Sequence, residues 1–203
     1  MRKRILLPMM LGAALCACHP APPQQAPMTP LPIQAVGVES PQRGDLLAHA
    51  LLVHRFAADD VSGVLDTANV TADKTISADG HGSLKISVPT PDTKTIALYE
   101  VDNPPSAAAG RFVYRLKLRT DKSFSGQAFV ELSARLTDSG DYLPRSIANG
   151  IQGGSQGAWV TLTSPFYMQS GDPSPKSLRL SLTLTGPATV WVDDVDLLQA
   201  PLH

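Results

Sequence analysis

The chain is short of cysteine. Its only two cysteines, Cys16 and Cys18, lie within the first 18 residues, so the rest of the sequence has no pair that could form a disulfide. An exported domain without disulfides depends on its hydrophobic core, or on a bound metal, for its stability. At 203 residues the chain is long enough for one domain with such a core.

Charged and aromatic residues are also scarce, at 17% and 5% of the sequence. The formal net charge is −1, and three of the 17 basic residues (Arg2, Lys3 and Arg4) lie at the N-terminus. Without those three, 14 basic residues face 18 acidic ones, a net charge of −4. Because nucleic-acid binding requires an excess of basic residues, this balance argues against a nucleic-acid partner.

The N-terminus lacks an apolar run long enough to span a bilayer. The segment Ile5–Leu15 has 11 residues, whereas a membrane-spanning helix needs about 20. A basic start followed by a short apolar run is typical of a secretory signal peptide, which we assign to residues 1–17. The sequence Leu15-Cys-Ala-Cys18 resembles the bacterial lipobox, and this resemblance implies that Cys18 becomes the lipidated, palmitate-bearing first residue of the mature chain.

Proline is abundant in the segment that follows the predicted signal peptide. Residues 18–43 form a nearly uncharged, proline-rich segment, a composition that favours extended polyproline II and acts as a semi-rigid spacer. We interpret it as a tether that holds a domain away from a membrane. His19, rather than an aspartate, follows the predicted lipid cysteine, so we expect the outer membrane of a diderm bacterium as the location.

Residues 44–203 have the pattern of a β domain, and no long segment shows a helical period. Apolar and polar residues alternate in Leu84–Val88, Phe112–Arg119, Ala128–Leu136 and Leu178–Leu184. Such alternation predicts antiparallel strands with one buried and one solvated face. In the second of these segments Phe112, Tyr114, Leu116 and Leu118 are expected to point inward, opposite Arg115, Lys117 and Arg119.

Weaker strand patterns cover Ala50–Phe56, Lys94–Val101, Trp159–Pro165 and Thr189–Leu198. Turn signals rich in Gly, Pro, Asn and Asp separate all of these segments. Many short strands joined by such turns indicate an all-β fold, an antiparallel β-sandwich or jelly roll.

The last strand contains two adjacent aspartates, Asp193 and Asp194, inside the apolar run Ala188–Leu198. Asp is poorly suited to a half-buried strand. A bound cation, a turn or an exposed edge would each explain this pair.

The order of motifs along residues 46–199 resembles that of galactose-binding-like jelly rolls, particularly bacterial carbohydrate-binding modules. The resemblance rests on Phe56 with the acidic segment after it, His81–Val88, Gly110–Leu118, the Ala158-Trp159 pair and Val190–Leu197. It implies a jelly-roll fold and a role in ligand binding.

The same resemblance implies a structural calcium ion. Many modules of this kind hold calcium between the first strand, a Gly-Ser-Leu turn and an aspartate of the last strand, and calcium takes about six to eight oxygen ligands. Ala57 stands where the family has an acidic residue directly after the first phenylalanine, so a nearby aspartate would have to replace it. The implied ligands are Asp59, Asp60, Gly82, Ser83 and Asp193.

No catalytic constellation emerges. Gly153–Gly157 spells the G-x-S-x-G of a nucleophile elbow, but no helical pattern follows it and the only later histidine is His203. We interpret it as a glycine-rich loop. The five histidines show no metal-ligand spacing, and Glu occurs only at positions 39, 100 and 131. The chain is therefore expected not to be an enzyme.

A sugar-binding face needs aromatic side chains beside polar ones. The two tryptophans, Trp159 and Trp191, are expected in the core or at its edge, because large aromatics usually contribute buried area. The candidate ligand-binding residues, on the solvent side of predicted strands or in loops, are Arg115, Lys117, Arg119, Phe129, Glu131, Arg135 and Tyr142.

These observations favour a non-catalytic, lipid-anchored binding module of the cell envelope, with a glycan as its partner. The alternative is a structural or protein-interaction lipoprotein that docks onto an envelope complex, and a hydrolase is the least supported.

Overall fold

The structure is a computed structural model that describes residues 50–105, 110–147, 150–167 and 173–201. The predicted signal peptide (1–17), Cys18 with the linker to residue 43, and residues 44–49 lie outside the described residues. None of the described residues belongs to a helix long and apolar enough to cross a membrane.

The described chain forms eleven strands. They are β1 (Leu51–Phe56), β2 (Val70–Asp73), β3 (Ser83–Val88), β4 (Thr93–Asp102), β5 (Gly110–Thr120), β6 (Gln127–Arg135), β7 (Leu143–Ile147), β8 (Ile151–Gln152), β9 (Val160–Tyr167), β10 (Ser177–Thr185) and β11 (Ala188–Pro201). All pairings between them are antiparallel.

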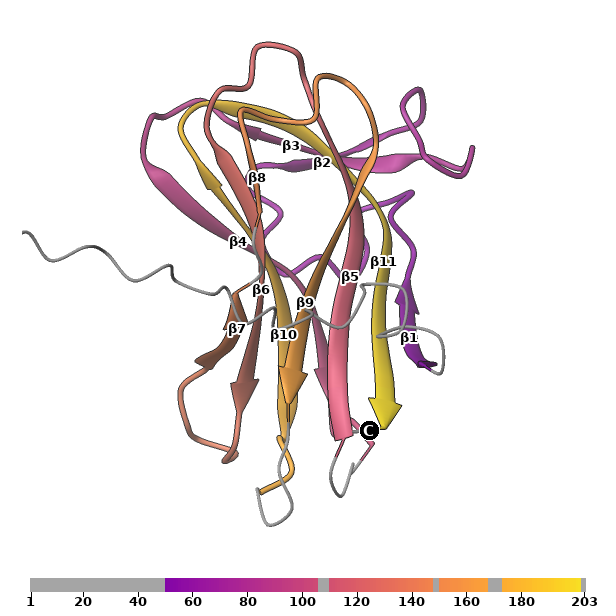
Figure 1. Cartoon of the computed structure of the whole chain (residues 1–203), viewed down its shortest axis with the longest axis vertical. Helices are drawn as coiled ribbons and strands as arrows, with labels where there is room; N and C mark the ends of the chain where they lie inside the picture. The colour runs from indigo at the N-terminus through magenta and orange to yellow at the C-terminus, as the bar shows by residue number, and fades with distance from the viewer. Residues whose placement is uncertain (1–49, 106–109, 148–149, 168–172, 202–203) are drawn as a thin grey trace, which may run out of the picture. The chain divides into compact units, whose positions relative to one another are not determined.

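The strands form two sheets. In sheet A the order is β2-β3-β11-β5-β9, with β1 also paired to β11. In sheet B the order is β4-β10-β6-β7, with β8 also paired to β6. Figure 1 shows β9, β5, β11 and β1 running side by side in sheet A. The two sheets face each other across one core, so the predicted antiparallel β-sandwich is confirmed.

Alternating residues of both sheets fill this core. Every one of the four predicted inward residues of β5, from Phe112 to Leu118, has 0% exposure, as do the four leucines of β10. Strict alternation therefore predicted the buried face correctly. The hydroxyl of Tyr114 is buried in the core and has no hydrogen-bond partner among the residues that the structure describes. This burial raises the pKa of the phenol well above its usual value.

Strand β11 holds sheet A together. Along one side it pairs first with β3, from Ala188 to Val192, and then with β1, from Val195 to Gln199, while β5 pairs along its other side. A β-bulge lies between Asp193 and Asp196, where β11 changes partner from β3 to β1. Asp194 has φ of 48°, a left-handed conformation that Asp tolerates better than most residues. The bulge therefore explains the two adjacent aspartates in a strand.

Candidate functional site

The seven predicted ligand-binding residues do not share a face. Strands β5 and β6 follow each other in the chain but belong to different sheets. Arg115, Lys117 and Arg119 lie on the outer face of sheet A, whereas Phe129, Glu131 and Arg135 lie on the outer face of sheet B, on the other side of the core. Tyr142 joins the second group through contacts with Arg135 and Glu100. The seven candidate residues therefore lie on two separate faces.

On sheet A the charged side chains bind one another. The carboxylate of Asp196 is 0% exposed and accepts hydrogen bonds from Arg55 Nε at 2.8 Å and from Arg115 Nε at 3.2 Å. This single buried carboxylate links β1, β11 and β5, the three strands that carry these residues. Lys117 Nζ lies 2.6 Å from Asp194 Oδ2, and that hydrogen bond raises the pKa of the lysine.

These groups line a pocket of about 500 Å³, together with Thr161 of β9. Its walls are ion pairs, so the polar groups there are already largely satisfied by one another. The pocket is a hollow between strands that the ion pairs hold in place.

Trp191 also lies on this face rather than in the core. Its neighbours Val190 and Val192 are fully buried, which turns the indole outward, where it is half-buried. Its Nε1 donates to Asp73 Oδ2 at 2.8 Å, and the Arg119 guanidinium lies 5.9 Å from the ring centroid. The sequence placed Trp191 in the core or at its edge; the V-W-V alternation puts it outside the core, half-buried on the outer face.

The centre of the outer face of sheet B has a different composition. Phe129, half-buried on β6, lies opposite Thr183 of β10, whose hydroxyl is hydrogen-bonded to that of Thr95 at 2.8 Å. Glu131, the next outward residue of β6, accepts a hydrogen bond from Ser133 Oγ at 2.7 Å. A threonine therefore lies opposite Phe129, the one aromatic residue of β6.

One end of this face carries a polar cluster around Tyr142. Its hydroxyl donates to Glu100, and its ring contacts the guanidinium of Arg179, which lies 3.6 Å from the centroid. Arg179 also donates to Glu100 Oε2 at 3.1 Å. Arg135 lies 5.5 Å from the same ring and donates to Ser177 Oγ at 3.0 Å.

Two pKa shifts follow from this cluster. Burial disfavours the charged form of Glu100, but the hydrogen bonds from Tyr142 and Arg179 outweigh it and lower the pKa of this carboxyl. Burial, and the hydrogen bond to Glu100, raise the pKa of Tyr142. The cluster is therefore an ionised carboxylate held between a neutral phenol and guanidinium groups.

Sequence reasoning missed Glu100 and Arg179. Arg179 is the only charged residue in the leucine-rich strand β10, and its place between inward leucines marks it as outward-facing. Glu100 faces Arg179 across the β4–β10 pairing.

The implied calcium ligands are brought together in part. A pocket of about 280 Å³ is lined by Asp59, Gly82 and Asp193 of the predicted set. Asp60 instead accepts hydrogen bonds from Ser62 in its own turn, and the side chain of Ser83 donates to the Ile76 carbonyl.

Asp79, which the sequence did not single out, and Asp194, which lay outside the implied ligand set, complete this acidic group. Their carboxylate oxygens and one of Asp193 lie within 4.8 Å of one another. Asp193 is 3% exposed and accepts hydrogen bonds from the backbone N–H groups of Ala78 and Asp194 at 2.7 and 2.8 Å. Three carboxylates near backbone turns offer the oxygen ligands that calcium prefers. The Lys117 ammonium, which pairs with Asp194, would compete with calcium for this carboxylate.

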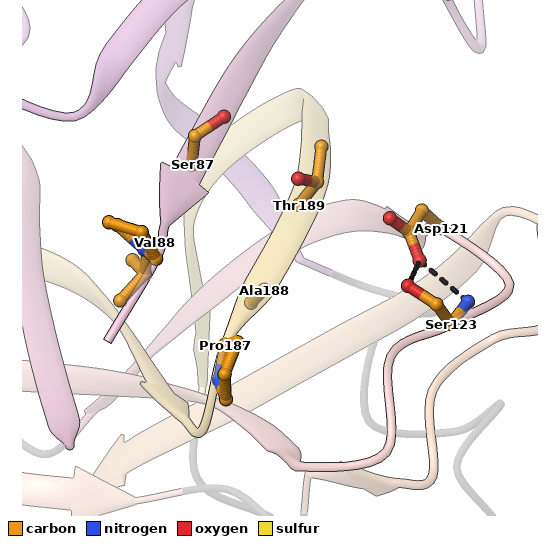
Figure 2. A pocket seen from close by; sticks show the side chains of 8 residues that line it. Ser87, Val88, Asp121, Ser123, Pro187, Ala188 and Thr189 are labelled. Carbon is orange, nitrogen blue, oxygen red and sulfur yellow. Dashed lines mark hydrogen bonds between the residues drawn. The ribbon is translucent and has the colours of Figure 1, made fainter. Parts of the chain in front are cut away.

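A third hollow, of about 230 Å³, lies where β3 ends near the β10–β11 turn (Figure 2). Its lining includes Ser87, Pro187 and Thr189. Asp121 also lines it, but its Oδ1 accepts hydrogen bonds from the backbone N–H and the hydroxyl of Ser123 at 2.6 and 2.7 Å and so closes the loop after β5 (Figure 2). None of the predicted site residues borders this hollow.

The G-x-S-x-G segment is a loop, as predicted. No helix follows Gly157; the chain passes directly into β9. Ser155 Oγ accepts a hydrogen bond from the backbone N–H of Thr120 at 2.9 Å, and Ser155 N donates to Thr120 Oγ1 at 2.8 Å. The serine therefore anchors this loop to the end of β5, a structural use of its hydroxyl.

Comparison with known proteins supports the fold. No protein-family model matches the chain, and no curated protein matches its sequence. The xylan-binding CBM22-1 domain of Paenibacillus barcinonensis Xyn10C matches with a TM-score of 0.58 and 12% identity, over 76% of this chain and 98% of that domain.

The CBM22-1–GH10 modules of Clostridium thermocellum xylanase Xyn10B, complexed with xylohexaose, match with a TM-score of 0.51 and 10% identity, over 76% of this chain and 29% of that one. The described domain is thus a β-sandwich of the carbohydrate-binding-module type, and the predicted resemblance is confirmed at the level of fold.

Proposed function

We propose that this chain is a non-catalytic glycan-binding module, and that the outer face of sheet B is its binding surface. The observation that carries the proposal is the position of Phe129, a half-buried aromatic ring in the middle of a sheet face that is otherwise polar. A sugar ring has an apolar C–H face and a rim of hydroxyl groups, so it is recognised by an aromatic surface with hydrogen-bonding groups beside it.

The neighbours of Phe129 supply those hydrogen-bonding groups. Glu131 is a carboxylate acceptor beside the ring. The Thr183 hydroxyl opposite the ring is 3% exposed and bonds to that of Thr95, which is exposed and can contact a ligand. Farther along the same face, the Arg179 guanidinium offers N–H donors that a planar, rigid group holds in fixed directions. The Tyr142–Glu100–Arg179 contacts keep these groups in place before a ligand arrives, which lowers the entropic cost of binding.

The structural neighbours suggest the first ligand to test. One is named as a xylan-binding domain and another was solved with xylohexaose. A β-linked polysaccharide such as xylan is therefore the starting point for a wider glycan panel.

The test is calorimetric titration of the domain with xylohexaose and with that panel. Phe129→Ala should weaken binding to the recognised glycan at least tenfold, or by about 1.4 kcal/mol. The matched control is Tyr167→Ala, which removes a 50% exposed aromatic from sheet A. Equal loss in both variants, or no binding to any glycan by the unmodified protein, would refute the proposal.

We further propose that a lipid on Cys18 anchors the module to the cell envelope, at the outer membrane. The support is the lipobox-like sequence Leu15–Cys18, followed by the proline-rich segment. Cys18→Ser should move the protein from the membrane fraction to the soluble fraction. Continued membrane association of the variant would contradict the anchor.

We also propose a structural calcium ion held by Asp79, Asp193 and Asp194, which would join the last strand to the turn before β3. Calcium should raise the Tm of the domain, and Asp193→Asn should abolish this rise while leaving the glycan surface on sheet B unchanged. If the Tm is the same in calcium and in chelator, Lys117 is the cation that these carboxylates use.

A further inference from the structure

The hollow of about 500 Å³ on the outer face of sheet A has more basic than acidic side chains in its lining. The acidic pocket of about 280 Å³ next to it has the opposite balance, and Asp79 and Asp193 line that pocket rather than the hollow. Three basic groups and two carboxylates give the hollow a formal charge of +1. Its lining comes from β1 (Arg55), β11 (Asp194 and Asp196), β5 (Arg115 and Lys117) and β9 (Thr161).

The two carboxylates of the hollow already have partners. Asp196 Oδ1 accepts a hydrogen bond from Arg55 Nε at 2.8 Å. Its Oδ2 accepts from Arg55 Nη2 at 3.4 Å, and from both Nε and Nη2 of Arg115. Asp194 Oδ2 lies 2.6 Å from Lys117 Nζ. The ion pairs of this hollow therefore use most of its acceptor oxygens.

The basic groups, in contrast, keep unused donors. In Arg55 and Arg115 alike, Asp196 engages Nε and Nη2, so Nη1 makes no hydrogen bond to a described residue. The Lys117 ammonium has three N–H groups and points one of them at Asp194. The hydroxyl of Thr161, an exposed residue, also has no partner among the described residues. A ligand that enters this hollow is therefore best matched if it brings acceptor oxygens and a negative charge.

We propose that the hollow binds an oxyanion group, that is, a carboxylate, sulfate or phosphate carried by a ligand. The planar guanidinium group presents its N–H donors in a fixed fork that matches such groups. Asp196 holds the guanidinium groups of Arg55 and Arg115 in place from either side, so little side-chain entropy remains to be lost on binding. The side chains of Arg55 and Arg115 are 59% and 31% exposed, and this contact with water keeps the expected affinity modest.

The size of the hollow fits more than a bare inorganic ion. Sites for small molecules have volumes of about 300–1,000 Å³, and this hollow lies within that range. It can therefore hold a sugar ring that carries the oxyanion group. The site is separate from the proposed glycan surface on sheet B, and neutral xylohexaose has no oxyanion group to place in it. Failure of glycan binding on sheet B would leave this proposal standing.

Titration of the mature chain carrying Cys18→Ser tests the proposal. The ligands are sodium glucuronate, sodium sulfate and sodium phosphate, with glucose as the neutral control and sodium chloride at matched ionic strength. The buffer is free of calcium, so that Asp194 stays paired with Lys117. The measurement is the NMR shift of the Nε–H groups of Arg55 and Arg115, and we expect saturation with a Kd of about 1–10 mM for at least one oxyanion.

The outcomes of this titration separate the sources of the oxyanion. Saturation by glucuronate alone would identify the carboxylate of an acidic sugar as the ligand group. Saturation by sulfate or phosphate alone would identify an ester group instead. Shifts that no oxyanion saturates, or that glucose or sodium chloride reproduces, would overturn the proposal.

Substitutions then assign the binding to this hollow. Arg55→Gln should weaken oxyanion binding at least about fivefold, while Arg115 keeps its hydrogen bonds to Asp196. Thr161→Val removes one hydroxyl without touching an ion pair and should weaken binding about threefold. The matched control is Lys122→Gln, which removes the same charge from an exposed position in the loop after β5 and should leave the affinity within about twofold.

Two results with these variants would overturn the site. Equal weakening by Arg55→Gln and Lys122→Gln would show a general effect of net charge rather than binding in the hollow. Unchanged affinity in both Arg55→Gln and Thr161→Val would place any oxyanion binding elsewhere on the molecule. Because Thr161→Val leaves every ion pair of the hollow intact, the test remains decisive if Arg55→Gln reduces stability.

Discussion

Sheets A and B share one core but present different chemistry on their outer faces. On sheet A, Asp196 and Asp194 pair with Arg55, Arg115 and Lys117, so charges from three strands neutralise one another. On sheet B, the centre of the face has hydroxyl groups around Phe129, and the charged groups gather at one end around Tyr142. Under the proposed function, the polar residues of sheet A join strands, whereas those around Phe129 on sheet B contact the glycan.

This contrast has a physical reason in the topology. Among the described strands, β1 pairs with β11 alone, and this pairing begins next to a bulge. The Asp196 clamp reinforces the weakly held edge strand where the ladder is irregular. Strand β10, in contrast, has a partner on each side over its whole length. Its backbone ladder is complete on both sides, and Arg179 and Thr183 add side-chain bonds to Glu100 and Thr95 of β4.

The largest expected effect is on stability, from Asp196→Ala. Breaking a buried ion pair costs about 3–5 kcal/mol, but Arg55 and Arg115 have side chains that are 59% and 31% exposed and regain water. We therefore expect a loss of about 2–3 kcal/mol in the free energy of unfolding, measured by urea denaturation. The control Glu131→Ala on sheet B should cost less than about 1 kcal/mol. If both variants lose the same free energy of unfolding, the outward carboxylates of the two faces contribute equally to stability.

A smaller effect is expected on glycan affinity, which should fall for a variant on sheet B but not for one on sheet A. Arg179→Ala removes the guanidinium that orders Glu100 and Tyr142, so affinity for the recognised glycan should fall about fivefold, or by about 1 kcal/mol. Lys117→Ala breaks one ion pair on sheet A and should leave the affinity within about twofold. Calorimetry measures the glycan affinity of both variants. A larger loss of affinity with Lys117→Ala than with Arg179→Ala would assign binding to sheet A.

The smallest effect concerns pH. The folded-state pKa of Glu100 is lowered by its hydrogen bonds from Tyr142 and Arg179, although burial opposes this. The stabilisation is therefore present above the ordinary Glu pKa of about 4.3 and is lost as the pH falls through the lower folded value. Glu100→Gln should flatten the dependence of Tm on pH below about 4.3 and have no effect on its slope near neutrality. An unchanged acid slope in this variant would show that Glu100 is not coupled to folding.

The sequence predicted the long strands because their side chains alternate strictly. Only a strand places the four leucines of β10 on one buried face, and the same holds for the alternating residues from Phe112 to Leu118 of β5. Strands β2 and β8 have four and two residues, too few for a clear period, and β7 contains Pro144 and does not alternate strictly; none of the three was predicted.

The grouping of site residues was harder to predict than the strands. Alternation shows that Arg115 and Phe129 both face outward, but it does not show which sheet each strand joins. Consecutive strands are usually neighbours, but β5 and β6 belong to different sheets, which alternation alone does not reveal. Asp79 was missed for calcium for a related reason, since only the fold brings its turn beside Asp193 of the last strand.

The central claim is that ligand binding belongs to sheet B, and amide chemical-shift mapping during a glycan titration tests it most directly. With xylohexaose, or the best glycan from the panel, the largest shifts should fall on Phe129, Glu131 and Thr183. The shifts of Arg115, Lys117 and Trp191 on sheet A should be no larger than the scatter seen for buried core residues. Shifts concentrated on sheet A, with sheet B silent, would contradict the claim.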